Sequence, residues 1–126
     1  MIGLPASVKI YLSAEPTDMR NGPDGLASRV RAHFSVSVFS GHLFVFLSKR
    51  RDRVKILWWD QGGFVVYYKR LERSRFKRPL GNRDGEVVLT PAELGSLLEG
   101  IDLSRARRSP LWRPQTHKRI DTERPM

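Results

Sequence analysis

The chain has 126 residues, of which 23 are Lys or Arg and 13 are Asp or Glu, so its net charge is +10. This length and an apolar fraction of 40% predict one domain with one modest core. The positive charge predicts attraction to polyanions, and the absence of cysteine excludes disulfides, thiol catalysis and thiolate metal sites.

The first half of the chain predicts a strand, a helix and a second strand. Residues 8–12 (VKIYL) have the β-branched and aromatic composition of a strand. After a loop rich in Pro, Gly and Asp, Pro23 begins a predicted helix over residues 23–34, in which large apolar residues recur every four positions. Residues 42–47 (HLFVFL) are apolar on both faces, as expected of a central strand.

The next two strands are predicted to form a hairpin. Residues 53–60 (RVKILWWD) and 64–70 (FVVYYKR) flank Gln61-Gly62-Gly63, which favours a tight turn. Together with residues 42–47 they form three strands in antiparallel order. The basic segment 71–85 contains Pro and Gly and is predicted to be a long connection, with a short strand near Phe76.

The last predicted elements are an edge strand and a helix. Residues 86–89 (EVVL) suit the strand, and Thr90 to Glu93 form a capping box that begins a helix over residues 91–99, which Gly100 ends. We therefore predict an α+β fold in residues 1–104, with a small antiparallel β-sheet of three to five strands, central hairpins and both helices on one face. Residues 105–126 are predicted to be a basic, disordered tail.

Only one face of the hairpin can belong to a one-sided core, because neighbouring strand residues point to opposite faces. The face with Ile56, Trp58 and Tyr67 is assigned to the core as the floor for both helices. The other face is apolar near the turn and cationic at its far end. A turn over residues 60–63 places Arg53 opposite Arg70, whereas a register shifted by two residues places Lys55 opposite Arg70. Both registers place two positive charges opposite each other, which is unfavourable unless solvent or a bound anion screens them.

Basic residues are concentrated in blocks. Residues 49–55 carry five bases and one acid, residues 69–83 seven and one, and residues 105–119 six and none, whereas residues 84–104 carry five acids and no base. Cations that contact phosphates, beside aromatic rings that stack on bases, are typical of nucleic-acid-binding surfaces. The predicted nucleic-acid-binding residues are Arg50, Arg51, Arg53, Lys55, Trp59, Tyr68, Lys69, Arg70, Arg73, Arg75, Lys77 and Arg78.

The sequence predicts no catalytic site. Its three histidines lack the spacing of metal ligands, and Asp at positions 18, 24, 52 and 60 suits turns and caps. We therefore predict no enzymatic activity, no cofactor and no metal. No stretch has the roughly 18 apolar residues of a membrane span, so we expect a soluble, cytoplasmic protein without a membrane partner.

Three stretches carry a family resemblance: TDMRNGPDGLA (17–27), the block from FSGHLFVFL to RSRF (39–76), and LTPAELGSLLEGID (89–102). Together they resemble the small accessory protein, called TnpB or second open reading frame, of the insertion sequence sixty-six family of bacterial transposable elements. The resemblance covers roughly residues 1–114. Compared with the usual pattern, Arg51 replaces a customary glycine before Asp52.

The resemblance implies a non-enzymatic accessory role in transposition, beside a separate transposase that carries the catalytic carboxylates. The partners it implies are DNA, in particular the element ends, together with the transposase and other element-encoded proteins, in the bacterial cytoplasm near the nucleoid. With the basic hairpin, it favours DNA binding that assists the transposase. The alternative is a protein–protein adaptor for the transposase, or a homodimer, without direct DNA contact; DNA specificity, oligomeric state and transposition step are left open.

Overall fold

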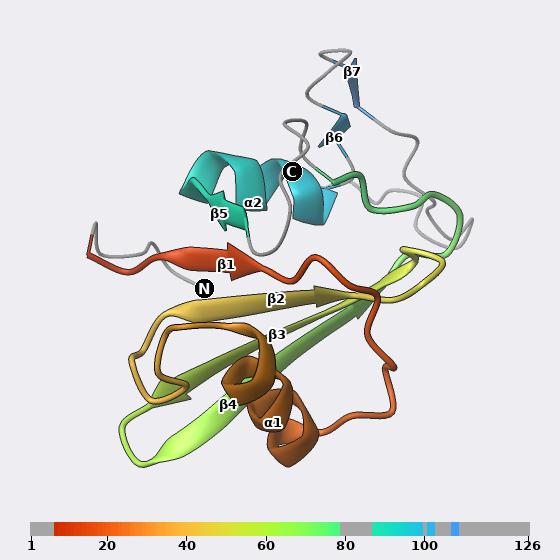
Figure 1. Cartoon of the computed structure of the whole chain (residues 1–126). Coiled ribbons are helices and arrows are strands. Elements are labelled where there is room, and N and C mark those ends of the chain that lie inside the picture. Colours follow the sequence, from red (N-terminus) through yellow and green to blue (C-terminus); the bar gives the residue numbers. More distant parts are fainter. Residues whose placement is uncertain (1–6, 79–86, 100, 103–106, 109–126) are drawn as a thin grey trace, which may run out of the picture.

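The computed structural model describes residues 7–78, 87–99, 101–102 and 107–108, which form two helices and a five-stranded mixed sheet of order β4-β3-β2-β1-β5 (Figure 1). A two-residue ladder pairs β6 (Ile101–Asp102) with β7 (Arg107–Arg108). The predicted α+β class is confirmed. The other elements are β1 (Ile10–Leu12), α1 (Pro23–His33), β2 (Leu43–Leu47), β3 (Arg53–Asp60), β4 (Gly63–Arg70), β5 (Val87–Leu89) and α2 (Pro91–Glu99).

The sheet is mixed because its first strand returns through a helix. β2, β3 and β4 run antiparallel, as predicted, but β1 pairs with β2 in parallel. A helical crossover such as α1 brings the chain back in the same direction, which a hairpin cannot do. The prediction of a wholly antiparallel sheet is therefore wrong at this pair, while the predicted strand at residues 86–89 is present as β5, antiparallel to β1 at the sheet edge.

The β3–β4 hairpin turns at Gln61 and Gly62, whose φ angles are 41° and 93°. Two successive left-handed residues match the twist of a two-residue hairpin. Asp60 pairs with Gly63, and the ladder continues without a break to Arg53 opposite Arg70. The first predicted register is thus confirmed, and the shifted one is wrong.

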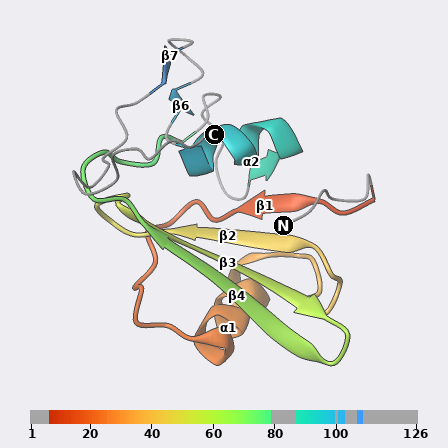
Figure 2. The same ribbon diagram turned by 180° about the vertical axis from the view of Figure 1, so that it is seen from behind.

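The two helices cover opposite faces of the sheet (Figures 1 and 2). On one face, Val30 of α1 packs in a cluster with Phe44 and Phe46 of β2. On the other, Leu97 of α2 packs in a cluster with Val45. The prediction that both helices share one face is therefore wrong: β2 is apolar on both faces, and burying all five of its residues requires a layer on each side.

The hairpin face predicted to point outward is divided between core and solvent. Leu57 is fully buried, and Phe64 and Val66 pack against the same cluster as α1. Only the end of this face near Arg53 and Arg70 is exposed. The prediction of an exposed face is thus wrong near the turn, where α1 covers the apolar side chains, and the cationic end stays uncovered.

The predicted capping box of α2 is confirmed. The Thr90 hydroxyl accepts the Glu93 N–H at 3.0 Å, and a Glu93 carboxylate oxygen accepts the Thr90 N–H at 2.8 Å. Gly100, predicted to end this helix, lies outside the described residues. Of the predicted tail over residues 105–126 the structure describes only β7, so the division into domain and tail stays a prediction.

Candidate nucleic-acid interface

Most of the predicted cations gather where the β2–β3 turn meets the chain that follows β4 (Figure 1). Two main-chain hydrogen bonds join these segments: Leu71 N–H donates to Asp52 O at 2.7 Å, and Phe76 N–H donates to Arg51 O at 2.7 Å. Residues far apart in sequence thus share one end of the sheet. This group, named the basic end, consists of Arg50, Arg51, Arg53, Arg70, Arg73, Arg75, Lys77 and Arg78.

The segment 71–78 is fixed to the fold by a buried ring and two arginines. The Phe76 side chain has 0% exposure and belongs to the core on the α2 side of the sheet. The Arg75 guanidinium donates to Arg50 O at 3.2 Å, and that of Arg78 donates to Ser13 O at 2.9 Å. The predicted strand near Phe76 is absent, because residues 75–78 bond to a turn and not to a strand edge.

Phe76 is a residue of the candidate site that the sequence prediction missed. It is the only large apolar residue between Leu71 and Leu80, in a stretch that is otherwise charged or polar. A single aromatic residue in a basic loop indicates that the loop is packed against the core at that residue, because large aromatic side chains are usually buried.

Positive charge at the basic end has little compensation. Arg70 pairs with Glu72 at 3.1 Å, but both side chains are about half exposed, and such surface pairs contribute roughly 0–1 kcal/mol. Among the described residues, no other member of the basic end pairs with a carboxylate. Burial lowers the pKa of the Arg78 guanidinium, and the nearby positive charge of Arg51 lowers it further. The arrangement therefore favours a polyanion as its partner.

Lys55 and Tyr68 lie beside the basic end, on the same face of the hairpin as Arg53 and Arg70. The Lys55 ammonium donates to Asn21 O at 2.8 Å and lies 5.5 Å from the centroid of the Tyr68 ring. Tyr68 is 49% exposed. These two predicted residues therefore join the group.

Trp59 and Lys69 do not join it. Trp59 lies at the turn end of the hairpin, six residues from Arg53, or about 20 Å at the usual rise of a strand. Its ring instead contacts those of Phe39 and Phe64 edge to face, with centroids 5.1 Å apart in both cases. The Lys69 ammonium donates to Leu98 O at 2.8 Å, and so supports the last turn of α2.

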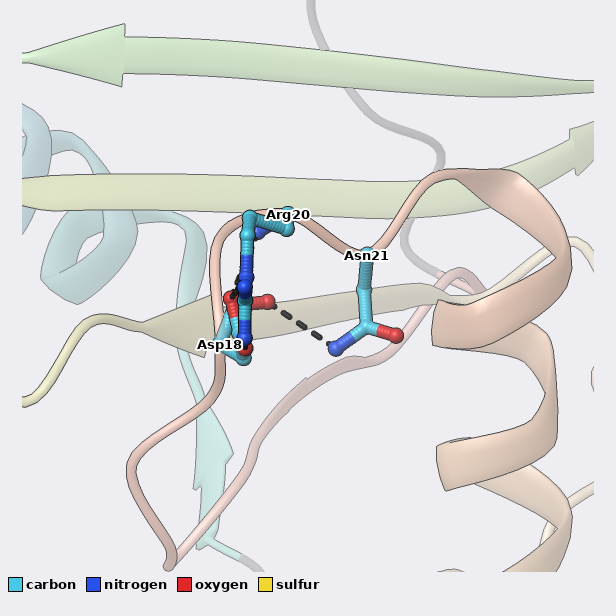
Figure 3. Close-up of polar contacts among 3 residues, drawn as sticks. All are labelled: Asp18, Arg20 and Asn21. Atoms are coloured by element: carbon cyan, nitrogen blue, oxygen red, sulfur yellow. Dashed lines mark hydrogen bonds and ion pairs between the residues drawn. The ribbon is translucent and has the colours of Figure 1, made fainter.

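The loop before α1 is held by polar contacts around Asp18 (Figure 3). Its carboxylate accepts hydrogen bonds from the Arg20 guanidinium and main-chain N–H at 2.6 and 2.8 Å, and its carbonyl accepts the Asn21 side-chain amide at 2.9 Å. The side-chain hydrogen bond from Arg20 lowers the pKa of Asp18 to about 2. The Asn21 amide lies against Gly25, where a Cβ atom would collide with Asn21 Oδ1. The TDMRNG stretch thus builds a loop that presents Asn21 O to Lys55.

The described residues contain no group of three or more His, Cys, Asp or Glu side chains that could hold a metal ion. His42 instead has a structural contact, since its Nδ1 accepts the Lys9 N–H at 3.0 Å. In the same ranges no helix has the length and apolar character needed to cross a membrane.

Arg51 occupies a backbone conformation that favours glycine, with φ at 59°. We expect Arg51→Gly to raise the free energy of unfolding by about 0.5–1 kcal/mol, because glycine carries no Cβ clash in the left-handed region. Arg50→Gly is the matched control: it removes the same charge at a residue whose φ is not positive, and should lower that free energy. Urea unfolding followed by tryptophan fluorescence measures both variants, and equal destabilisation by the two would contradict strain at Arg51.

Comparisons with known proteins agree with the resemblance seen in the sequence. The family described as IS66 Orf2 like protein matches residues 8–108. The uncharacterized protein y4jC of Sinorhizobium fredii is 34% identical over 114 residues, which cover 90% of this chain and 97% of that protein. The uncharacterized protein y4hO of the same organism is 35% identical over 108 residues, covering 86% of this chain and 91% of that protein. No solved structure matches this chain significantly.

The family match includes every strand and helix from β1 to β7 and the whole basic end. The matches cover nearly the full length of each relative. The resemblance is thereby confirmed, and with it an accessory place in transposition. The chain belongs to the IS66 Orf2-like family of transposable-element proteins.

Proposed function

We propose that this protein binds DNA through the basic end and thereby assists the transposase of its element. The observation that supports the proposal is the gathering of cations from two distant segments, held together by the Leu71–Asp52 and Phe76–Arg51 hydrogen bonds. Crowded like charges oppose folding unless anions screen them. DNA phosphates would supply that screening and release counterions as they bind.

The exposed guanidinium groups are suited to phosphate oxygens. Arg50, Arg53 and Arg73 are exposed, and a guanidinium contacts a phosphate through two parallel N–H donors. Arg75 and Arg78 use part of their donors on carbonyl oxygens, and each guanidinium has five N–H groups in all. Contacts of this kind position a protein on DNA without reading its sequence, so we assign recognition of the element ends to the complex with the transposase.

The salt dependence of DNA affinity tests this proposal. Fluorescence anisotropy of the full chain, on an element-end duplex and on a random duplex of equal length, gives the affinity at each salt concentration. Six to eight phosphate contacts predict a fall of about 10³ to 10⁴ between roughly 50 and 200 mM salt. A flat salt response, or no binding at the lowest salt, would overturn the proposal.

A second candidate function is a protein adaptor, favoured by the aromatic cluster of Phe39, Trp59 and Phe64. Phe39 is 53% exposed, although large apolar side chains are usually buried. Capture of the transposase from cells that carry the element separates the two candidates. An adaptor predicts that Trp59→Ala abolishes capture and Arg70→Ala leaves it intact, and DNA-mediated assembly predicts the reverse.

A further inference from the structure

β4 is an edge strand without the usual protection. It is the outermost strand on its side of the sheet, and its outer edge has no strand partner among the described residues (Figure 2). Its eight residues form a continuous ladder with β3, contain no proline, and carry no charge before Lys69. Natural proteins protect long edges with prolines, bulges or charges. Lys69 and Arg70 lie together at the last two positions of the strand, so the edge from Gly63 to Tyr68 has no such charge.

The ladder fixes which main-chain groups face outward. Leu71 N–H donates to Asp52 O, so the odd-numbered residues of this strand exchange hydrogen bonds with β3. The N–H and C=O groups of Phe64, Val66 and Tyr68 therefore point to the open edge. They form a row of alternating donors and acceptors that a further antiparallel strand would satisfy.

We propose that the open edge of β4 pairs with β4 of a second copy of this chain, in antiparallel orientation about a twofold axis. An axis perpendicular to the sheet keeps α1 of both copies on the same side of the combined sheet. A residue whose main-chain groups point to the open edge can therefore pair only with another residue of that kind. With Val66 at the axis, Phe64 lies opposite the partner's Tyr68, and all the outward groups of these residues are paired. This register brings aromatic side chains together across the strands, which stabilises a ladder.

Charge favours this orientation. Lys69 and Arg70 stand together at one end of the strand, so a parallel pairing would place each opposite its own copy. The antiparallel pairing places Lys69 opposite the partner's Gly63 instead. The two basic ends then lie on opposite sides of the axis and do not repel each other at close range.

The exposed aromatic side chains favour a second copy over an unrelated strand. Among the described residues the exposed large apolar side chains are Phe39, Tyr68 and Val88. The Phe39 ring stacks on that of Phe64 with centroids 5.7 Å apart, and Phe64 is the residue that faces the partner's Tyr68. The symmetric contact thus covers Phe39 and Tyr68, which are two of the three exposed side chains. Both the exposed Tyr68 ring and the Phe64 ring that covers it in the partner come from the same sequence.

The dimer also changes the expected role of Tyr68. In the dimer Tyr68 packs on the partner subunit and not on DNA bases, so only the cations contact DNA. Arg70 and the partner's Arg70 are eight residues apart along the paired strands, or about 27 Å, which is roughly the length of eight base pairs of duplex DNA. The inference that two basic ends contact one duplex rests on the proposed DNA binding, whereas the inference of a dimer does not.

The mass in solution tests the dimer independently of DNA. Sedimentation velocity at tens of micromolar should give twice the 14.5 kDa mass of one chain. Tyr68→Pro removes an outward N–H and spares the bonds to β3, so this variant should sediment as a monomer with an unchanged far-UV circular dichroism spectrum. A wild-type monomer would overturn the proposal, and so would a folded Tyr68→Pro variant that remains dimeric.

Cross-linking tests the register, because the chain has no cysteine of its own. Val66→Cys should form an interchain disulfide under mild oxidation, since hydrogen-bonded neighbours on antiparallel strands have Cα atoms about 5.5 Å apart, within disulfide range. The controls are Tyr68→Cys on the same strand and Val88→Cys on the other edge strand, both at exposed positions, which should form little interchain disulfide. Failure of Val66→Cys to cross-link, or equal cross-linking at all three positions, would overturn the proposed pairing.

Discussion

Phe76→Ala is expected to lower the free energy of unfolding by about 3–5 kcal/mol, because it empties a fully buried aromatic site. A domain of this size has roughly 5–15 kcal/mol of stability in all, so the loss is a large share of it. Phe76 is also the one fully buried residue of the segment 71–78, and its N–H bond to Arg51 O holds that segment against the β2–β3 turn. The substitution should therefore loosen half of the basic end as well as the core.

Urea unfolding followed by tryptophan fluorescence measures this effect, with Lys77→Ala as the control. Lys77 is the exposed neighbour of Phe76, and its truncation should change the free energy of unfolding by no more than about 0.5 kcal/mol. Similar unfolding midpoints for the two variants would show that the Phe76 ring does not anchor the segment.

The double variant Arg53→Gln with Arg73→Gln should weaken DNA binding on every sequence and flatten its salt dependence. Both side chains are exposed, and neither has a hydrogen bond or ion pair among the described residues, so the fold should be unaffected. Each lost phosphate contact reduces the slope of log affinity against log salt by about 0.9, so we expect the slope to fall by about 2. Anisotropy titrations over a series of salt concentrations measure this slope.

The matched control is Lys9→Gln with Arg31→Gln, which removes two exposed cations that lie outside the basic end. Its change in net charge is the same, so any effect of overall charge on long-range attraction is the same. The control should keep the wild-type slope. Equal reductions in the two double variants would mean that DNA binding depends on net charge and not on this surface.

Local features of the fold could be predicted because local chemistry determines them. The hairpin turn needs residues that accept positive φ, and Gln61-Gly62 supplies them next to an alternating ladder. The cap of α2 needs only Thr90 and Glu93. Each feature lies within a few residues of its sequence signal.

Features that depend on long-range packing were predicted wrongly. The sequence between β1 and β2 indicates a helix, but the parallel pairing of these strands follows from the path of the chain over the sheet. The apolar character of β2 on both faces is a sequence feature that favours α1 and α2 on opposite sides of the sheet. An apolar stripe on a helix shows which side of the helix is buried, and does not show which face of the sheet it covers.

In the candidate site, too, local features could be predicted and features that depend on long-range packing could not. Charge blocks in the sequence identified the cations, but only the fold shows that Arg50 and Arg75 touch while Trp59 lies at the far end of the hairpin. Lys69 was predicted to bind phosphate, and its bond to Leu98 O depends on the position of α2. The third basic block, residues 105–119, lies outside the described residues except at β7.

Mapping of amide chemical shifts during titration with a duplex shows residue by residue whether DNA binds through the basic end. Binding through the basic end predicts that the largest changes fall in residues 48–53 and 70–78 and lessen as salt is raised, while α2 and β5 change little. Changes concentrated around Trp59 or on α2, with none at the basic end, would contradict it.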